Sequence, residues 1–152
     1  MAGRPVLICF DGSANAHEAI ARAGELFPSR PVVVLHVWES LKEVASVPPV
    51  PGLAGMLEAG LEEMDVIGAD VSRKTAEEGA RAAVAAGLSA EPLTVQAPGR
   101  AWHGILAAAR EQDAVAIVMG RRGISGPERA LLGSVSNAVL HHADRPVLIV
   151  PE

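Results

Sequence analysis

Aromatic residues and cysteine are scarce in this chain, and both shortages restrict what it can be. Its 152 residues include two tryptophans, two phenylalanines and no tyrosine. Aliphatic side chains must therefore fill the core, which suits a parallel sheet packed between helices. The single cysteine, Cys9, excludes a disulfide within the chain. Because Cys9 lies in an apolar run, we predict a buried and inert thiol, with a redox role as the alternative.

A basic excess and a long apolar segment are also missing. The formal net charge is −5, which argues against a general nucleic-acid-binding protein, since such proteins are usually basic. The chain has no run of about 18 apolar residues, so we expect no membrane span. Residues 1–5 lack the apolar segment of a secretory signal. We therefore expect one cytoplasmic domain over residues 1–152, with no nucleic acid and no membrane as partners.

Short apolar runs alternate with helical patterns along the chain. The predicted strands are 5–10, 32–38, 91–96, 114–119 and 146–150, and the predicted helices are 14–26, 53–86, 101–112 and 134–142. This alternation predicts an α/β fold, a doubly wound parallel sheet with right-handed crossovers and helices on both faces. Such sheets bind ligands at the carboxyl ends of their strands. The proline-rich residues 46–52 form either a flap near those ends or a plain connector.

A glycine-rich stretch after the fourth predicted strand is the most informative feature of the sequence. Gly120-Arg-Arg-Gly123 begins there, and Gly133-Ser-Val-Ser136 follows after nine residues. Glycines let the backbone approach an anion and adopt a positive φ, and the helix that follows points free N–H groups at it. The hydroxyls of Ser134 and Ser136 can add donors. The spacing predicts a phosphate site, although taken singly such glycines often only shape a loop.

Other nucleotide and catalytic motifs are absent from the sequence. Neither lysine, Lys42 or Lys74, follows a glycine, so there is no Walker A loop, and no GxG pair exists for a dinucleotide fingerprint. No Gly-x-Ser-x-Gly elbow appears. The histidines form no HxH or HExxH pattern, so we predict no metal held by protein ligands. We also find no nucleophile with a base beside it.

The spacing Gly120-x2-Gly123-x9-Gly133-Ser134 resembles the nucleotide-binding signature of the ATP-binding branch of the universal stress protein family. The first predicted strand leading into Asp11-Gly-Ser13, the apolar run 32–37 and the closing run 145–150 follow in the family's order. The resemblance spans nearly the whole chain. It implies an adenine-nucleotide α-hydrolase-like fold with a five-stranded sheet of order 3-2-1-4-5. That order brings Asp11 and Gly120 to one crevice.

The resemblance also implies a phosphate end for the site. Gly120 and Gly123 would cradle the phosphates, while Gly133, Ser134, Val135 and Ser136 would meet the phosphate tail where the last helix begins. Arg121 lies in the same loop, and Arg122 and Arg129 lie in or beside it. Arginine suits phosphate because its guanidinium donates in a fork and stays charged. Each arginine alone is as readily a solvated surface residue, but we expect at least one to contact phosphate.

The adenosine end is implied by the same resemblance. Asp11 would lie beside the adenosine, Cys9 and Phe10 would line the same wall, and the backbone of Val37 would read the adenine edge. The alternative for Asp11, from the residues alone, is a turn in which its side chain accepts backbone N–H groups. Val37 is equally suited to plain core packing.

The expected ligand is ATP, with Mg²⁺ held through the phosphates and water. The resemblance further implies a homodimer through the last strand, Val147–Val150, whose apolar edge would favour pairing.

No residue that orients an attacking water is identifiable, so we expect a stress-response regulator with a downstream protein partner rather than an enzyme. Slow hydrolysis or autophosphorylation stays open. The alternatives are an interaction module that binds no nucleotide and, less favoured, a nucleotide-using enzyme. AMP and cyclic AMP share the adenosine of ATP, and the spacing does not separate them.

Overall fold

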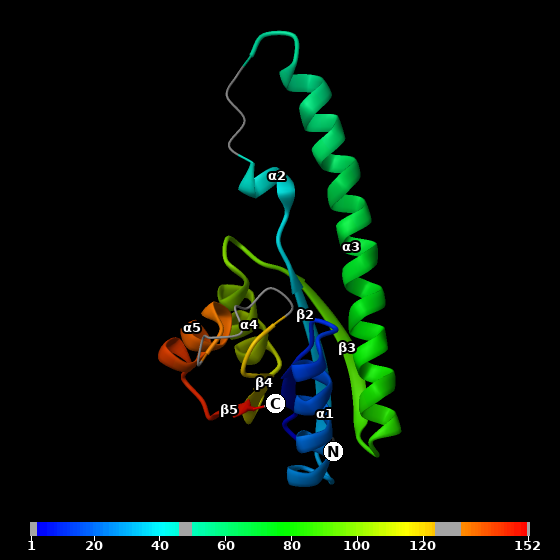
Figure 1. Cartoon of the computed structure of the whole chain (residues 1–152), viewed down its shortest axis with the longest axis vertical. Coiled ribbons are helices and arrows are strands. Elements are labelled where there is room, and N and C mark those ends of the chain that lie inside the picture. Colours follow the sequence, from blue (N-terminus) through cyan, green and yellow to red (C-terminus); the bar gives the residue numbers. More distant parts are fainter. Residues whose placement is uncertain (1–2, 46–49, 124–131, 152) are drawn as a thin grey trace.

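The computed structural model describes residues 3–45, 50–123 and 132–151. At its centre lies a five-stranded sheet in which every pairing is parallel and the strand order is β3-β2-β1-β4-β5 (Figure 1). The strands are β1 Val6–Cys9, β2 Pro31–Trp38, β3 Ser89–Gln96, β4 Ala116–Gly120 and β5 Val147–Val150. The predicted fold class and strand order are confirmed.

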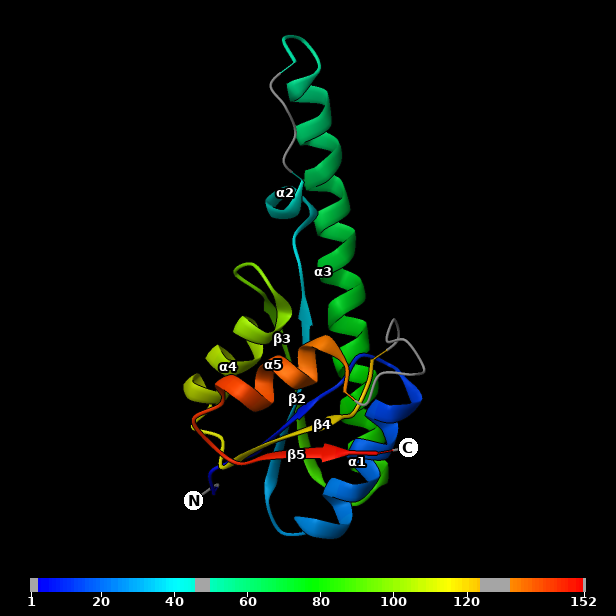
Figure 2. The same cartoon turned by 60° about the vertical axis from the view of Figure 1, so that its left-hand side comes forward.

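Helices cover both faces of the sheet (Figure 2). They are α1 Ala14–Leu26, α3 Ala54–Ala85, α4 Ala101–Glu111 and α5 Ser134–His142, with a single turn, α2, at Leu41–Val44. Successive side chains of a strand point to opposite faces. Val6 and Ile8 of β1 therefore pack with α1 and α3, while Leu7 packs with α4 and α5. The aliphatic core predicted from the composition fills both layers.

Helix α1 shows how the sequence positions the edge of the sheet that carries the site. The side chain of Ser13 accepts a hydrogen bond from the backbone N–H of Ala16 at 3.1 Å, so it caps the first turn. Ala16, Ala19 and Ala23 lie on the buried face of the helix. These small side chains let α1 pack closely over β1 and β4. The helix begins five residues after β1 ends.

Helix α3 extends well past the sheet (Figures 1 and 2). Its second part buries small residues, but the residues of α3 before Ser72 are exposed or only half-buried. Helix α2, which the sequence did not predict, lies beside this projecting part. The hydroxyl of Ser40 donates to the carboxylate of Asp65, and the ammonium of Lys42 donates to Glu62 at 2.7 Å. We call residues 40–45 and 50–71 the arm, and residues 72–85 the base of α3.

The remaining differences from the predicted elements are at their ends. Strand β3 begins at Ser89 rather than Glu91, because its pairing with β2 already starts at Pro31. Strand β4 begins at Ala116 rather than Ala114. The flap suggested for 46–52 falls largely on residues 46–49, which lie outside the described residues. Among the helices in the described ranges, none is long and apolar enough to cross a membrane.

Candidate functional site

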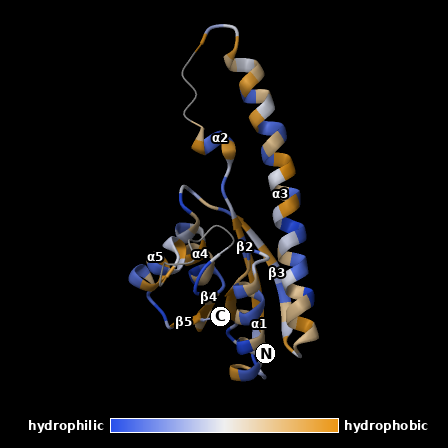
Figure 3. Ribbon diagram, in the orientation of Figure 1, coloured by the Kyte–Doolittle hydropathy of each residue, from blue (hydrophilic) through white to orange (hydrophobic). Residues whose placement is uncertain are grey.

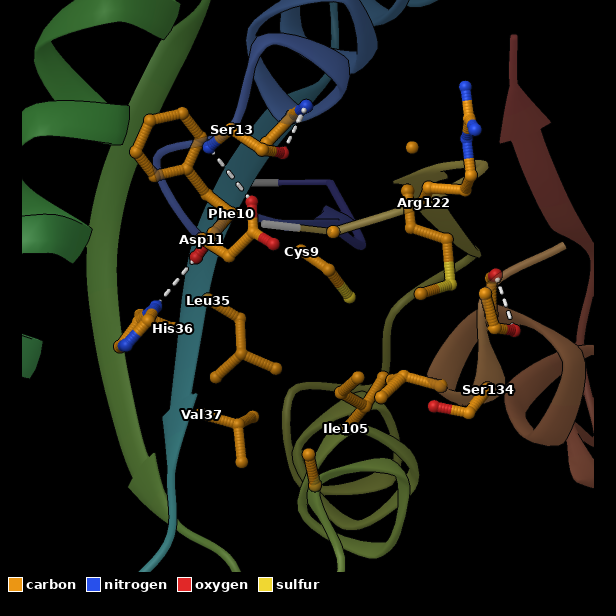
Figure 4. A pocket seen from close by; sticks show the side chains of 18 of the residues that line it. Cys9, Phe10, Asp11, Ser13, Leu35, His36, Val37, Ile105, Arg122 and Ser134 are labelled. Atoms are coloured by element: carbon orange, nitrogen blue, oxygen red, sulfur yellow. Dashed lines mark hydrogen bonds between the residues drawn. The ribbon is translucent and has the colours of Figure 1, made fainter. Parts of the chain in front are cut away.

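A cavity of about 540 Å³ opens at the carboxyl ends of β1, β2 and β4. The sheet order reverses between β1 and β4, since β2 and β3 lie on one side of β1 and β4 and β5 on the other. Ligands of doubly wound sheets bind at this switch point. Figure 4 shows side chains from both sides of the switch pointing into the cavity.

Ten of the eleven predicted site residues line this cavity. They are Cys9, Phe10, Asp11, Val37, Gly120, Gly123, Gly133, Ser134, Val135 and Ser136. The structure therefore brings together segments that are more than a hundred residues apart in the sequence. That these residues bind a nucleotide stays a prediction.

Arg121 is the predicted site residue that does not line the cavity. Its backbone N–H donates to the carbonyl of Val150 at 2.9 Å, so it continues the pairing of β4 with β5. Its Nε is buried and has no hydrogen-bond partner within the described part of the chain. The chain turns after it, and Arg122 is the arginine that reaches the cavity wall. Arg129 lies outside the described residues.

The glycines of the signature serve close approach rather than an unusual backbone conformation. Of the two properties for which glycine suits such a site, positive φ is not used at Gly120, Gly123 or Gly133. A Cβ added at Gly120 would lie 2.7 Å from the Cβ of Asn15, and one at Gly123 would lie 2.6 Å from Oδ2 of Asp11. Gly133 has more room, with its nearest neighbouring atom at 3.4 Å. The first two glycines thus bring the loop against α1 and Asp11.

Ser136 joins the two described ends of the glycine-rich segment between β4 and α5, which we call the glycine loop. It is buried, and its hydroxyl lies 2.7 Å from the carbonyl of Arg121 and 3.1 Å from that of Gly133. The Gly133 N–H also donates to the Arg121 carbonyl, at 2.9 Å. The Ser136 hydroxyl proton is therefore committed to the loop, contrary to its predicted use as a phosphate donor. Ser134 is exposed and stands in the first turn of α5, where backbone N–H groups have no partner within the helix.

Asp11 takes the turn role that the sequence left open, and it also faces the cavity. Its Oδ1 accepts a hydrogen bond from the backbone N–H of Ser13 at 3.0 Å. Gly12 between them has a φ of 81°, a conformation that favours glycine. The turn fixes the carboxylate at the end of β1, beside Gly123. Among the described residues that line the cavity, Asp11 is the one carboxylate.

Two residues near the cavity were missed from the sequence. Asn15 is buried, with 7% of its surface exposed, and its side-chain N–H donates to the Arg122 carbonyl at 3.1 Å. It thereby ties α1 to the glycine loop. His36 lines the cavity, and its Nδ1 lies 2.7 Å from the carbonyl of Phe10. The available signal for Asn15 was a polar residue on the otherwise apolar face of α1.

The thiol of Cys9 stands at the cavity wall and is half-buried. Burial, helped by the negative charge of Asp11, raises the pKa of Cys9 to about 12. The thiol therefore stays protonated at neutral pH, which fits the predicted inert role. The described residues contain no group of three or more His, Cys, Asp or Glu that could hold a metal ion.

Comparison with known proteins bears on this site. A family model described as "Universal stress protein family" matches residues 3–151. The chain is 33% identical to universal stress protein YxiE of Bacillus subtilis over 150 residues, covering 95% of this chain and 97% of the relative. The chain belongs to the universal stress protein family.

Solved structures of family members share the fold. A universal stress protein from Archaeoglobus fulgidus in complex with dAMP has a TM-score of 0.67 at 21% identity, covering 99% of both chains. A universal stress protein in complex with cAMP has a TM-score of 0.63 at 26% identity, covering 99% of this chain and 98% of the other. Adenine nucleotides are thus bound by proteins of this fold.

Proposed function

We propose that this universal stress protein binds ATP in the cavity at the switch point and acts as a nucleotide-dependent regulator in the cytoplasm. The observation that carries the proposal is the cavity itself, in which the glycine loop, the start of α5 and the end of β1 meet. Its volume of about 540 Å³ lies within the range of roughly 300–1,000 Å³ that small-molecule sites occupy. The binding of dAMP and cAMP by family members supports an adenine nucleotide.

The adenosine fits the apolar side of the cavity. Leu35, Val37 and Ile105 line that side, and apolar walls suit a flat base that leaves water. In this arrangement the backbone of Val37 faces the adenine edge, and the carboxylate of Asp11 accepts hydrogen bonds from the ribose. Phe10 and Cys9 close the wall next to Asp11.

The phosphates fit the opposite side, where α5 begins. The first-turn N–H groups of α5 and the helix dipole favour an anion there, and the exposed hydroxyl of Ser134 adds a donor. Arg122 supplies the positive charge that Arg121 was predicted to supply. Mg²⁺ would be held mainly by the phosphates. The described residues of the cavity supply one carboxylate, which is too few ligands to hold the ion without them.

The described cavity residues that could accept a proton from water are Asp11, Cys9 and His36, and Nδ1 of His36 is already engaged with the Phe10 carbonyl. Asp11 is engaged with the Ser13 N–H, and the thiol of Cys9 is protonated. The protein is therefore assigned a regulatory role in the stress response, passed on to a downstream protein partner, and not an enzymatic one.

A homodimer through β5 belongs to the same proposal. Strand β5 is at the edge of the sheet, and Val147, Leu148 and Ile149 are half-buried. An apolar edge strand with unpaired backbone groups favours pairing with the same strand of a second chain.

The test begins with the nucleotide content of freshly purified protein, by heat release and mass spectrometry, followed by calorimetry with ATP, AMP and cyclic AMP, each with and without Mg²⁺. We expect ATP near one per chain. Arg122→Ala should weaken ATP binding about tenfold, the loss of one charged hydrogen-bonding group. Arg30→Ala, an exposed arginine before the amino end of β2, is the matched control and should leave binding unchanged. A protein that carries no nucleotide and gives no heat would instead be an interaction module without a nucleotide.

A further inference from the structure

Large apolar side chains on the surface are concentrated on the arm. Among the described residues, thirteen large hydrophobic residues are exposed, and ten of them lie between Leu41 and Val71. Met56 is 75% exposed, Ile67 58% and Met64 54%. Figure 3 shows hydrophobic bands along the projecting part of α3. An exposed apolar surface of this kind marks an interaction site.

Five of these residues on and next to α3, together with Gly60, repeat with the spacing of a coiled coil. They are separated by four, three, four, three and four residues, and we call them the stripe: Leu53, Leu57, Gly60, Met64, Ile67 and Val71. Positions three and four apart lie on one side of a helix. A seam with this alternation is typical of a helix that packs along a second helix.

The stripe is not the side of α3 that packs within the chain. The half-buried or buried positions are Leu61, Asp65, Gly68 and Ser72, which follow one another along a neighbouring line of the helix. Helix α2 lies against this same line and the positions next to it, because the Leu41 N–H donates to Asp65 at 2.7 Å and Lys42 pairs with Glu58 at 3.5 Å and with Glu62 at 2.7 Å. Every large side chain of the stripe is therefore left exposed.

We propose that the stripe pairs with the stripe of a second copy of this chain, with the two α3 helices antiparallel. In that register Leu57 faces Ile67 of the second copy, Val71 faces Leu53 of the second copy, and Met64 faces Gly60 of the second copy. In the central layer a large residue lies opposite a small one. The flexible Met64 side chain fills the space that the missing side chain of Gly60 leaves open.

The exposed apolar area of the stripe can be compared with the area that a homodimer interface buries. Burying one large aliphatic side chain removes roughly 100 Å² of apolar surface from water, so the stripe with Met56, each side chain about half exposed, contributes about 300 Å² per copy. A standard interface buries about 800 Å² per partner, and roughly 65% of that area is apolar in homodimers. The stripe supplies more than half of the apolar area required. Because the stripe alone does not reach that area, we expect a pairing weaker than that of an obligate dimer.

The charges beside the stripe determine how this pairing should depend on the salt concentration. Glu63 directly precedes Met64 and borders the stripe. In the antiparallel register it comes close to Glu63 of the second copy, and salt screens the repulsion between like charges. Association through the arm therefore strengthens as the salt concentration rises, whereas binding of a basic partner helix would weaken.

The first experiment measures assembly of the full chain by sedimentation equilibrium at several salt concentrations. Ile67→Glu and Met64→Glu should each raise the dissociation constant of the arm contact at least about tenfold, since each places a carboxylate in an apolar seam. Val66→Glu is the matched control, because Val66 is 71% exposed on the same helix but off the stripe. It should change the constant less than about twofold. Strand β5 is left intact, so any association through that edge persists in every variant. Equal masses for wild type and Ile67→Glu would overturn the proposal.

The second experiment tests the register by cross-linking. Two differently tagged chains are mixed in a Cys9→Ala background, one carrying Gly60→Cys and the other Met64→Cys. A side chain fits at Gly60, since a Cβ there meets no atom within 4 Å. Antiparallel pairing predicts mixed disulfides between the two tags. Cross-links only between like chains would show a parallel pair, and no cross-links at all would show that the stripe does not pair with a second copy; either result contradicts the proposal.

Neither experiment depends on the nucleotide. The stripe lies on the projecting part of α3, and none of its residues lines the cavity. Loss of arm pairing with ATP binding intact would thus leave the proposed function standing. Absence of ATP binding with arm pairing intact would leave this inference standing.

Discussion

Residues 54–71 of the arm and the base of α3 form one continuous helix, yet the two parts differ in which side chains they expose and which they bury. The base buries small residues, namely Ser72, Ala76, Gly79, Ala80 and Ala83. The arm exposes large ones such as Met56 and Ile67. The residues with the greatest hydrophobicity are therefore not the ones that hold the helix to the sheet. Small residues let the helix come close enough for Phe10 and Val34 to pack against its backbone.

Two glycines on the sheet-facing side of α3, one in the base and one in the arm, differ in the room they leave for a side chain. A Cβ added at Gly79 would lie 2.7 Å from atoms of both Phe10 and Val34. A Cβ added at Gly68 would lie 3.6 Å from the ring of Trp38, an ordinary contact distance. The same substitution should therefore have opposite effects on the two sides of the boundary.

Gly79→Ala should have the largest effect, because it overpacks the base. We expect it to destabilise the protein by about 2 kcal/mol, the cost of forcing a methyl group into a filled core, measured by urea unfolding. The contacts at Phe10 and Val34 involve side chains that the core already fixes in place. A neutral result would mean that the base packs as loosely as the arm.

Ser72→Ala should stabilise the base by about 1 kcal/mol. The Ser72 hydroxyl is fully buried, and its oxygen has no hydrogen-bond partner within the described residues. Alanine removes the polar atom, leaves almost no cavity and favours the helix. Urea unfolding checks the sign, and Thr75→Ala serves as a control because the Thr75 hydroxyl donates to the Val71 carbonyl. Destabilisation by Ser72→Ala would show that the hydroxyl is hydrogen-bonded in solution.

Gly68→Ala should stabilise the protein by about 0.5–1 kcal/mol, the gain in helix propensity over glycine. The added methyl group touches Trp38 without displacing it. Unfolding followed by tryptophan fluorescence reports both the stability and the contact. A loss of stability comparable to that of Gly79→Ala would erase the distinction between the arm and the base.

Acid should loosen the arm before the base, with a small effect. The hydrogen bond from Ser40 holds the pKa of Asp65 below its usual range, with help from the Leu41 N–H and against the opposing effect of desolvation. Since the folded pKa lies below the unfolded value of about 3.9, this stabilisation is present above that pH and is lost as the pH falls through the folded pKa. Amide NMR signals of α2 should shift below about pH 4. In Asp65→Asn they should be shifted at every pH; a wild-type transition near neutrality would contradict the assignment.

The fold was largely predictable because its signals are local and repeated. The limits of α1 and α5 agree with the predicted 14–26 and 134–142, since Ser13 caps one helix and Gly133 precedes the other. Helix α2 was missed because a single turn has almost no intrinsic stability. Its support comes from Asp65, 25 residues further along the chain. The long helix was predicted, but its pattern does not reveal that only the base meets the sheet.

The site was predictable where the sheet topology alone determines position. Parallel strands present their carboxyl ends at one edge, so the ends of β1, β2 and β4 had to meet. The role of Asn15 was not predictable, because it depends on one hydrogen bond to a carbonyl 107 residues away. Arg122 rather than Arg121 lines the cavity because of the point at which the chain leaves the β4–β5 pairing. The sequence contains no signal for that point.

The buried hydroxyl of Ser136 has an evolutionary consequence. Gly120 and Ser136 are required to build the loop whether or not a ligand is present, so selection for folding preserves them in descendants that have lost a nucleotide. The exposed hydroxyl of Ser134 takes no part in the hydrogen bonds by which Ser136 and Gly133 hold the loop closed. Among relatives that have lost the ligand, substitutions should therefore accumulate first at Ser134, while the glycine signature around it persists as an inherited scaffold.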